Sequence, residues 1–383
     1  MPSVDLAMCG LTLLLAIYSP TRLLAYSPTR LLDATRMNIA ICASQVPFVR
    51  GGAEVLVDGL AEALTAHGHQ VAVVSLPFKW YPKEQLLRGA LAWRLLDLTE
   101  ANGVPIDLAI CTKYPTWAVR HPRKVAWVVH QHRQAYDWYG TPLSDFANTP
   151  EDREIRRRIR AIDEAGLGEC KRLYGISRNI TARLERFNRL RAEPLYPPIR
   201  LRGLGPTATP ITDDGTILSV SRLDAAKRVG LLIEALARTR TPIRATIVGS
   251  GPDEGALRRL AEERGVAGRV TFLGAVSDEG VVARYNACRA VFYAPVDEDY
   301  GLATVEAFTA GKPVLTATDS GATREFVRDG ENGAVVAPEP SAIAAVLDRW
   351  HGDAASAQRL GLAGRAAVAG ISWARVVATL TGQ

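Results

Sequence analysis

The chain has 383 residues, of which 48% are hydrophobic and 22% charged, enough for two domains that each bury a core. Its formal net charge of +6 suits an anionic ligand or membrane face. No aromatic-basic motif accompanies that charge, so nucleic-acid binding is not indicated. The five cysteines are scattered and form no C-x-x-C pair, which favours reduced core residues of a cytoplasmic protein over a disulfide or zinc framework.

Residues 1–36 stand apart from the rest of the chain. The stretch YSPTRLLA at 18–25 is followed at once by the near-copy YSPTRLLD at 26–33. The apolar run GLTLLLAI is too short to span a bilayer, and no Lys or Arg precedes it as a signal peptide requires. We expect a disordered extension, of the kind that a start codon set too far upstream would add; a weak membrane-contacting arm is the alternative.

From Met37 onward, short β-branched runs alternate with helical stretches, a pattern typical of an α/β protein with a parallel sheet covered on both faces. The stretch GGAEVLVDGLAEALTAHG has apolar residues at helical spacing and ends on Gly68. In this first half the expected strands are 38–43, 71–75, 106–111, 124–129 and 172–176.

A Pro- and Gly-rich stretch near 190–215 predicts a linker, after which the alternation restarts. The second set of expected strands is 216–221, 244–248, 269–273, 290–294 and 314–318. Two doubly wound units joined in this way predict a cleft between domains, with ligands at the carboxyl ends of the strands. The domains would be 37–195 and 216–365, joined by a linker at 196–215, with residues 366–383 as a helix packing back toward the cleft.

Two glutamates bracket a predicted helix start in PVDEDYGLATVEAFTAGKPV. The first amides of that helix, from Gly301 through Leu302 to Ala303, have no partner within the helix. Together with the helix dipole they favour an anion by about 0.3–2 kcal/mol per charge. With a diphosphate there, Glu306 would reach a ribose diol, and Glu298 the group on the other phosphate. The alternative is that both are surface carboxylates that favour a helix N-terminus.

Two other stretches of the second half carry residues that suit a phosphate. Arg222 follows a predicted strand and Lys227 lies at the start of the next helix, so two cations could neutralise a diphosphate without a metal. Gly249 and Gly251 form a strand-to-helix turn that would let the backbone approach a ligand closely. A lone G-x-G is a weak signal.

In combination, these residues closely resemble the donor domain of retaining glycosyltransferases with the GT-B fold, family 4, also called glycosyl transferases group 1. That family has an Arg and a Lys after the first strand, then G-x-G, then two glutamates separated by seven residues, with G-x-P-V following. The resemblance extends more weakly over about residues 37–380. It implies two Rossmann-like doubly wound domains facing a central cleft, with a nucleoside-diphosphate sugar as co-substrate and no metal.

The resemblance also assigns roles to single positions. Arg222 and Lys227 would hold the diphosphate, Glu306 the ribose and Glu298 the hydroxyls of the transferred sugar.

In the first half, RGGAEV resembles the family's Gly-rich loop, so Gly51 and Gly52 would approach the donor. The stretch VAWVVHQHRQAYDWYG resembles the one that carries the family's active-site histidine, for which we take His130. His132 would share its face if the strand continues, which leaves a metal pair or a purely structural histidine open.

Some positions depart from the family pattern. Asp299 and Tyr300 stand where the family usually has Gly-Phe, and the family's Gly-Gly-Pro before a later glutamate is replaced by the sequence Gly321-Ala322-Thr323 ahead of Glu325. Ser221 replaces a frequent glycine, and Arg228 follows Lys227 where glycine is usual. These changes leave the predicted phosphate site intact and the identity of the donor sugar open.

Two features of the first half bear on the acceptor. Aromatic residues that could stack on a sugar, or belong to the core, are Trp80, Tyr81, Trp117, Trp127, Tyr136, Trp138 and Tyr139. A predicted helix carries a cluster of arginines that forms either a solvated face or a patch for anionic lipid or a lipid-linked phosphorylated acceptor: Arg153, Arg156, Arg157, Arg158 and Arg160.

The sequence thus predicts transfer of a sugar from a nucleoside diphosphate to a hydroxyl of a sugar, lipid-linked or natural-product acceptor, with retention at the anomeric carbon. A polysaccharide, lipopolysaccharide or glycoconjugate pathway, in the cytoplasm or at the inner face of the membrane, is what the resemblance implies. The alternatives are a nucleotide-sugar epimerase or hydrolase of the same fold, and a non-catalytic nucleotide-sugar-binding protein. The sugar, the base, the acceptor and the oligomeric state stay open.

Overall fold

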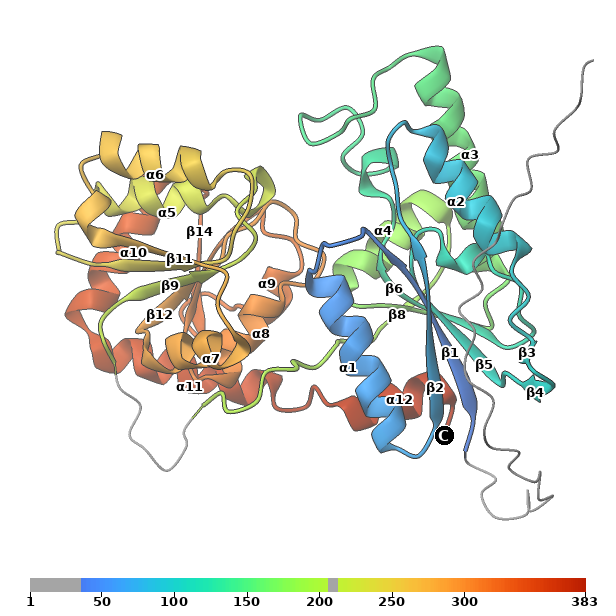
Figure 1. Ribbon diagram of the computed structural model, residues 1–383. Helices are drawn as coiled ribbons and strands as arrows, with labels where there is room; N and C mark the ends of the chain where they lie inside the picture. Colours follow the sequence, from blue (N-terminus) through green and yellow to red (C-terminus); the bar gives the residue numbers. More distant parts are fainter. Residues whose placement is uncertain (1–35, 206–212) are drawn as a thin grey trace, which may run out of the picture. The chain divides into compact units, whose positions relative to one another are not determined.

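A computed structural model describes residues 36–205 and 213–383 (Figure 1). The expected extension therefore lies outside the described residues except for Arg36, and so does part of the expected linker. The domain boundaries stay predictions, whereas the sheets and helices on which they were based can be compared with the structure directly.

The first half is built on a six-stranded sheet in the order β2-β1-β5-β6-β7-β8, in which every pair is parallel. All the expected strands are confirmed to within two residues at either end. The sequence did not predict the short hairpin of β3 and β4 or the edge strand β8. The strands are β1 (Asn38–Gln45), β2 (Gln70–Pro77), β3 (Glu100–Ala101), β4 (Val104–Pro105), β5 (Leu108–Lys113), β6 (Lys124–His130), β7 (Arg172–Gly175) and β8 (Glu193–Pro194).

The second half repeats this plan with a six-stranded parallel sheet in the order β11-β10-β9-β12-β13-β14. The expected strands are confirmed again, and the additional edge strand β14 was not predicted. The strands are β9 (Ile217–Val220), β10 (Ala245–Val248), β11 (Val270–Gly274), β12 (Ala290–Phe292), β13 (Val314–Ala317) and β14 (Gly333–Val336).

The central strands are buried along nearly their whole length, because helices cover both faces of a parallel sheet. In β1 every residue from Ile39 to Ser44 is buried, while the edge strand β2 alternates between exposed and half-buried positions. The strands β12 and β13 are buried throughout. This burial is why uninterrupted apolar runs located the strands in the sequence.

Helices on both faces complete each half. In the second half, α5 packs against α6 and α10, and α8 packs against α11 (Figure 1). The helices are α1 (Gly52–Ala66), α2 (Glu84–Leu95), α3 (Pro150–Gly168), α4 (Arg178–Asn188), α5 (Val229–Leu236), α6 (Glu254–Glu263), α7 (Asp278–Ala287), α8 (Leu302–Thr309), α9 (Thr323–Phe326), α10 (Pro340–Gly352), α11 (Ala354–Val368) and α12 (Trp373–Thr381). Single 3₁₀ turns lie at Thr116–Ala118, Arg133–Ala135, Ala225–Lys227 and Ala267–Arg269.

The last helix, α12, returns to the first half of the chain and packs against α1 (Figure 1). Its Trp373 lies edge-on to Trp127 of β6 with the ring centroids 6.3 Å apart. A Cβ at Gly59 of α1 would come within 2.5 Å of the Trp373 ring, so glycine there permits the close approach. Arg172 of β7 donates to the carbonyl oxygens of Thr379 and Leu380 and so satisfies part of the helix C-terminus.

The strand orders locate the expected binding edges. In a doubly wound sheet, ligands bind beyond the carboxyl ends of the strands where the winding direction reverses. That reversal lies between β1 and β5 in the first sheet and between β9 and β12 in the second. The loops after these four strands are therefore where we expect substrates to bind.

Candidate functional site

A lysine and a glutamate from two different loops meet at the switch point of the second sheet. Lys227 follows β9 and Glu298 follows β12, and the Lys227 Nζ lies 2.5 Å from Glu298 Oε2. Nζ also donates to the Tyr293 hydroxyl at 3.3 Å. Burial lowers the pKa of Lys227, but Tyr293 and Glu298 outweigh it and raise the pKa above its usual range. The structure thus brings together two residues that the sequence assigned to different parts of a donor, and each neutralises the other.

Arg222, the other predicted phosphate cation, lies in the same loop and is more accessible. Its side chain is 61% exposed, and its Nε donates to Asp224 Oδ2 at 2.9 Å. The remaining guanidinium nitrogens donate to no atom of the residues that the structure describes. An exposed arginine with free donors can turn toward a phosphate at little cost.

The glycines after β10 have a packing role that the sequence did not indicate. A Cβ at Gly249, whose φ is +123°, would come within 1.9 Å of the Ser221 carbonyl oxygen, and one at Gly251 within 2.2 Å of the Leu223 carbonyl oxygen. Backbone hydrogen bonds join the same two loops, including Ser250 O to the Leu223 amide at 3.0 Å. The glycines therefore let the β9 and β10 loops pack together; a direct contact with a ligand stays a prediction.

The start of α8 has the features expected of an anion site. Gly301 is its N-cap residue in the left-handed region, at φ +82°, and no acidic side chain lies in the first turn. The amides of Leu302 and Ala303 donate to no other atom of the described residues. The buried hydroxyls of Thr304 and Thr323 beside Gly301 likewise have no hydrogen-bond partner among them. Four polar hydrogens are thus left without an acceptor around one helix start.

Glu306 lies one turn deeper on α8, as predicted, and is only 8% exposed. Its Oε2 accepts a hydrogen bond of 2.8 Å from the Tyr285 hydroxyl of α7. Burial raises the pKa of Glu306 to about 7, although the bond from Tyr285 acts in the opposite direction. Its Oε1 has no hydrogen-bond partner among the described residues, so this oxygen is open to a further hydrogen-bond donor.

In the first half, the predicted Gly-rich loop lies at the switch point between β1 and β5. The Gly51 amide donates to Glu54 Oε2 at 2.9 Å, and Lys113 at the end of β5 pairs with Glu54 Oε1 at 2.8 Å. The start of α1 is therefore already occupied by a carboxylate of its own. A Cβ at Gly52 would meet no atom within 4 Å, so the backbone is accessible on that side. Contact of Gly51 and Gly52 with a donor stays a prediction.

The two candidate histidines have different surroundings. His130, at the carboxyl end of β6, is half-buried, and its Nδ1 lies 2.9 Å from the Gln131 carbonyl oxygen. Burial lowers the pKa of His130, and the nearby Asp299 carboxylate partly offsets that effect. His132 is buried among Phe78, Tyr114 and Phe146, and burial lowers its pKa to about 4. Of the two, His130 is the one whose pKa responds to Asp299, a residue of the loop that carries Glu298.

A metal site is the alternative that the paired histidines left open. Across residues 36–205 and 213–383, no group of three or more His, Cys, Asp and Glu side chains is placed to hold a metal ion.

Sequence reasoning missed the residues of the first half that contact the loop after β12. Arg133 and Arg183 form ion pairs with Asp297 and Asp299. The signal available in the sequence was Asp299 itself, at a position where the related family usually has glycine.

The aromatic residues of the first half divide between core and surface. Trp117, Trp127 and Tyr136 are buried, whereas Tyr81 is 60% exposed. The sequence did not single out Phe48, which is fully exposed in the loop between β1 and α1 with φ at +65°. An exposed aromatic ring beside the Gly-rich loop is suited to stacking on a sugar face.

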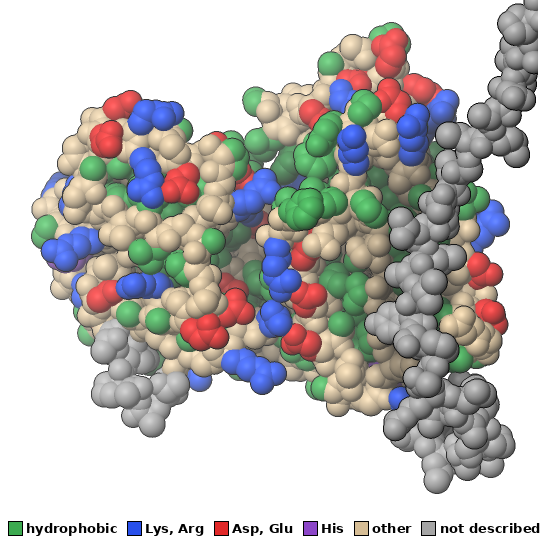
Figure 2. All heavy atoms as spheres, viewed as in Figure 1, with side chains coloured by type: hydrophobic (Ala, Val, Ile, Leu, Met, Phe, Trp, Pro, Cys, Tyr) green, Lys and Arg blue, Asp and Glu red, His purple; other side chains and the backbone are tan. Residues whose placement is uncertain are grey.

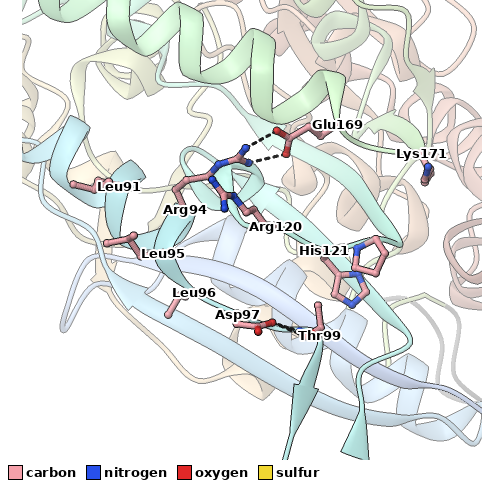
Figure 3. A pocket seen from close by; sticks show the side chains of 11 residues that line it. Leu91, Arg94, Leu95, Leu96, Asp97, Thr99, Arg120, His121, Glu169 and Lys171 are labelled. Carbon is pink, nitrogen blue, oxygen red and sulfur yellow. Dashed lines mark hydrogen bonds and ion pairs between the residues drawn. The ribbon is translucent and has the colours of Figure 1, made fainter.

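A cavity of about 830 Å³ lies at the opposite edge of the first sheet (Figure 3). Its lining comes from α2 and from the segments just before β6 and β7, which are the amino ends of those strands. Arg94 and Glu169 form a two-pronged ion pair in its wall, at 2.8 Å for each contact. Because ligands of parallel sheets bind at the carboxyl ends, we do not assign the donor or the acceptor to this cavity.

The arginine cluster lies on α3, beside a groove of about 460 Å³. Arg157 and Arg158 both pair with Glu154, and the Arg156 guanidinium stacks on the Tyr139 ring at 4.0 Å. On the face shown in Figure 2, basic and acidic side chains are interspersed. These contacts suit a solvated helix face, and membrane contact stays a prediction.

One stretch of the described chain, Ala354–Thr381, is long and apolar enough to cross a membrane, and an 18-residue window within it has a mean hydropathy of 1.2. Length and composition alone are weak grounds for a membrane span. This stretch comprises α11 and α12, which are separated by a turn, and the buried Val376 and Leu380 of α12 belong to the core of the protein.

Comparison with known proteins agrees with this geometry. Residues 207–367 match the family described as glycosyl transferases group 1. This stretch is therefore similar to a group 1 glycosyl transferase domain. It contains Arg222, Lys227, Glu298 and Glu306, the residues on which the predicted donor site depends.

Similar proteins extend the comparison to the rest of the chain. D-inositol 3-phosphate glycosyltransferase of Nocardia farcinica is 37% identical over 167 residues, covering 40% of this chain and 37% of that protein. The chain thus aligns with well under half the length of this relative. Sucrose-phosphate synthase of Thermosynechococcus elongatus has a similar structure, with a TM-score of 0.71 at 22% identity over 90% of this chain and 97% of that one.

The Anabaena protein HepE, in a structure that contains UDP and glucose, matches with a TM-score of 0.66 at 18% identity over 91% of this chain and 100% of that one. At this level of identity the likeness establishes the fold. The described chain has the GT-B fold, as the sequence predicted.

Proposed function

We propose that this protein transfers a sugar from a nucleoside-diphosphate sugar to an acceptor hydroxyl, with retention at the anomeric carbon. The observation that carries the proposal is that Lys227 and Glu298 meet at the switch point of the second sheet, beside the start of α8, whose first amides have no acceptor among the described residues. The group 1 domain and the relatives named above, two of them a glycosyltransferase and a sugar-phosphate synthase, support the same activity class.

The donor would be held by residues of the second half. Arg222, Lys227 and the amides of Leu302 and Ala303 supply positive charge and hydrogen-bond donors for a diphosphate. When a diphosphate binds, the three N–H groups of Lys227 would be shared between Glu298 and a phosphate oxygen. When no nucleotide sugar is bound, the ion pair with Glu298 keeps this buried lysine neutralised.

The sugar and nucleoside ends of the donor would be recognised by the two glutamates. An ionised Glu306 can accept both hydroxyl donors of a ribose diol while keeping its bond from Tyr285. Glu298, on the other side of the α8 start, would accept from the hydroxyls of the transferred sugar. UDP is bound by the similar HepE, which favours testing uridine nucleotides first.

In the transfer, the bond between the anomeric carbon and the diphosphate oxygen breaks and a bond to the acceptor oxygen forms. The acceptor's proton passes to the leaving phosphate oxygen, so no protein base is required. Arg222, Lys227 and the α8 amides stabilise the charge that develops on the diphosphate. The oxocarbenium-like centre would lie between the phosphate and, at longer range, Glu298 and His130.

The acceptor would bind to the first half, near His130 and the Gly-rich loop. A sugar, a lipid-linked sugar or a natural product fits the proposal, as do polysaccharide, lipopolysaccharide and other glycoconjugate pathways in the cytoplasm or at the inner face of the membrane. The relative that acts on an inositol phosphate makes a phosphorylated polyol one acceptor to test.

The deciding experiment is a thermal-shift and calorimetric screen of UDP, GDP, ADP and their sugars, followed by transfer assays with the donor that binds. We expect one nucleotide to raise the melting temperature, activity to persist in EDTA, and the product to keep the donor's anomeric configuration by NMR. Donor turnover at full rate without acceptor would instead favour a hydrolase or epimerase. Binding of no nucleoside diphosphate would overturn the proposal.

A further inference from the structure

The loop after β12, residues 297–301, is joined to the first half of the chain by a cluster of charged groups. The Arg183 Nη2 lies 2.8 Å from Asp297 Oδ2, and its Nη1 also pairs with Asp299. Arg133 lies 3.2 Å from both of these aspartates. Asp137 completes the cluster, at 2.5 Å from Arg133 and 3.7 Å from Arg183. Two cations are thus shared by three carboxylates, and two of those carboxylates flank Glu298.

Side chains of α4 and of its N-cap residue Ser177 also hold the backbone of this loop. Three successive carbonyl oxygens of the loop accept a hydrogen bond from this helix: Asp297 O from Arg183 at 2.9 Å, Glu298 O from Asn179 at 2.9 Å, and Asp299 O from Ser177 at 2.5 Å. The chain around Glu298 therefore owes its position to the first half as well as to its own sheet.

A carboxylate of the second half completes the junction. Glu325 of α9 accepts from the amides of Arg178 and Asn179 at 2.9 and 2.8 Å, and from the Tyr196 hydroxyl at 2.8 Å. It occupies the positive end of the α4 dipole, where a negative charge is favoured. The α4 start thus binds the second half through both its side chains and its amides.

Asp299 is a largely buried acidic group that pairs with both arginines of the cluster. Its side chain is 17% exposed and those of Arg183 and Arg133 are 8% and 10% exposed. Burial alone would raise the pKa of Asp299, but Arg133 and Arg183 outweigh it and hold the pKa at about 2. Removing one member of such a buried group leaves the opposite charge uncompensated, which is far more disruptive than losing a surface pair.

We propose that Asp299 is a positioning residue that fastens the loop carrying Glu298 to the first half through Arg183 and Arg133. The inference rests on the proposed function, because it assigns the two substrates to different halves. The contacts proposed for the nucleoside diphosphate, Arg222, Lys227, Glu306 and the α8 amides, all belong to the second half, and none of them is a member of the cluster. Glu298, which would contact the transferred sugar, is the one proposed donor contact that lies in the fastened loop. The acceptor side and His130 belong to the first half, so only the transfer step needs the connection.

The test is Asp299→Asn, with Asp213→Asn as a matched control, since Asp213 pairs with Arg289 inside the second half at 2.9 Å. In Asp299→Asn we expect the dissociation constant of the nucleoside diphosphate to stay within about twofold and kcat for transfer to fall about thirtyfold, consistent with loss of a buried charge contact. Asp299→Glu, which keeps the charge, should recover part of kcat. The control should change neither constant.

Hydrogen exchange of the Arg178 and Asn179 amides gives a readout independent of activity. We expect faster exchange at both amides in Asp299→Asn than in the wild type or in Asp213→Asn. Unchanged kcat, or unchanged exchange, in Asp299→Asn overturns the inference, and so does an equal loss of nucleotide affinity. If the wild type binds no nucleoside diphosphate, the proposed function fails, while the exchange rates still decide whether Asp299 fastens the loop.

Discussion

At the switch point of each sheet a lysine pairs with a glutamate, Lys113 with Glu54 in the first half and Lys227 with Glu298 in the second. Glu54 lies within the first turn of its helix and accepts from the amide of the N-cap residue Gly51, so a negative charge already lies at that helix start. Glu298 lies ahead of its helix, beyond Gly301, and leaves the first amides of α8 without an acceptor. A helix start can bind an external anion only where no carboxylate of the protein already lies in its first turn.

The largest expected effect comes from removing each lysine in turn. Lys227→Met should lower kcat/KM for transfer by about a hundredfold or more, because it removes a cation from the developing diphosphate charge. Lys113→Met should lower it much less, since its partner Glu54 already satisfies the α1 start. Steady-state kinetics on both variants, with melting temperatures as a check on folding, measure the difference. Equal losses of kcat/KM in the two variants would contradict the proposal that only the switch point of the second sheet binds the diphosphate.

Arg222→Ala tests the phosphate contact proposed for the second half. Loss of about 2 kcal/mol of charge-assisted hydrogen bonding should weaken nucleoside-diphosphate binding about thirtyfold. Arg238→Ala, which removes an exposed arginine just after α5, is the matched control and should leave the affinity unchanged. Isothermal titration of both variants checks this, and an unaltered affinity in Arg222→Ala would remove Arg222 from the site.

The pH dependence of donor binding tests Glu306. With its pKa at about 7, the ionised form that accepts a ribose diol grows about tenfold between pH 6 and 8, so donor affinity should rise by about that factor. A nucleotide sugar is the right probe, because its diphosphate does not titrate in this range. Glu306→Gln should bind more weakly and show no such slope, and a slope that survives this substitution would point to another group.

The raised pKa of Glu306 also affects the stability of the protein, in the direction opposite to its effect on donor affinity. The folded-state pKa of Glu306 lies above its usual value, so the folded protein binds this proton more tightly than the unfolded chain does. The ligand-free protein should therefore lose stability as the pH rises through about 7, and Glu306→Gln should lose less. Denaturant unfolding of both proteins at pH 6 and 8 measures this loss as the change in the free energy of unfolding.

The smallest effect concerns the glycines at the two helix starts. Gly301→Ala should cost about 1–2 kcal/mol of stability, because a left-handed backbone strains any residue with a Cβ. That Cβ would also lie 2.9 Å from Thr323 Oγ1. Gly52→Ala should be neutral or slightly stabilising, since its Cβ would lie in open space on a helix. Thermal unfolding measures the stability of both variants. Similar melting temperatures for Gly301→Ala and Gly52→Ala would contradict the expected difference.

Much of the fold could be predicted because central parallel strands are buried on both faces and read as uninterrupted apolar runs. The edge strand β8 was missed because it is only two residues long. The other missed edge strand, β14, is as long as the predicted β13, and nothing in the structure explains its omission. In the second half, the donor-site residues lie in short loops after consecutive strands, so their spacing could be matched to a family pattern. The role of Asp299 could not be predicted, because its partners Arg133 and Arg183 are more than a hundred residues away in the chain.

The two parallel sheets, the likeness to group 1 glycosyl transferases and the residues that flank α8 could all be predicted from the sequence, because each depends on local periodicity or spacing. Three contacts could be found only from the folded protein. Lys227 neutralises Glu298, burial between α7 and α8 raises the pKa of the Glu306 carboxyl, and α4 holds the loop after β12. Such contacts depend on how distant segments pack, and both pairing and burial change the free energy of a charge far more than its neighbours in sequence do.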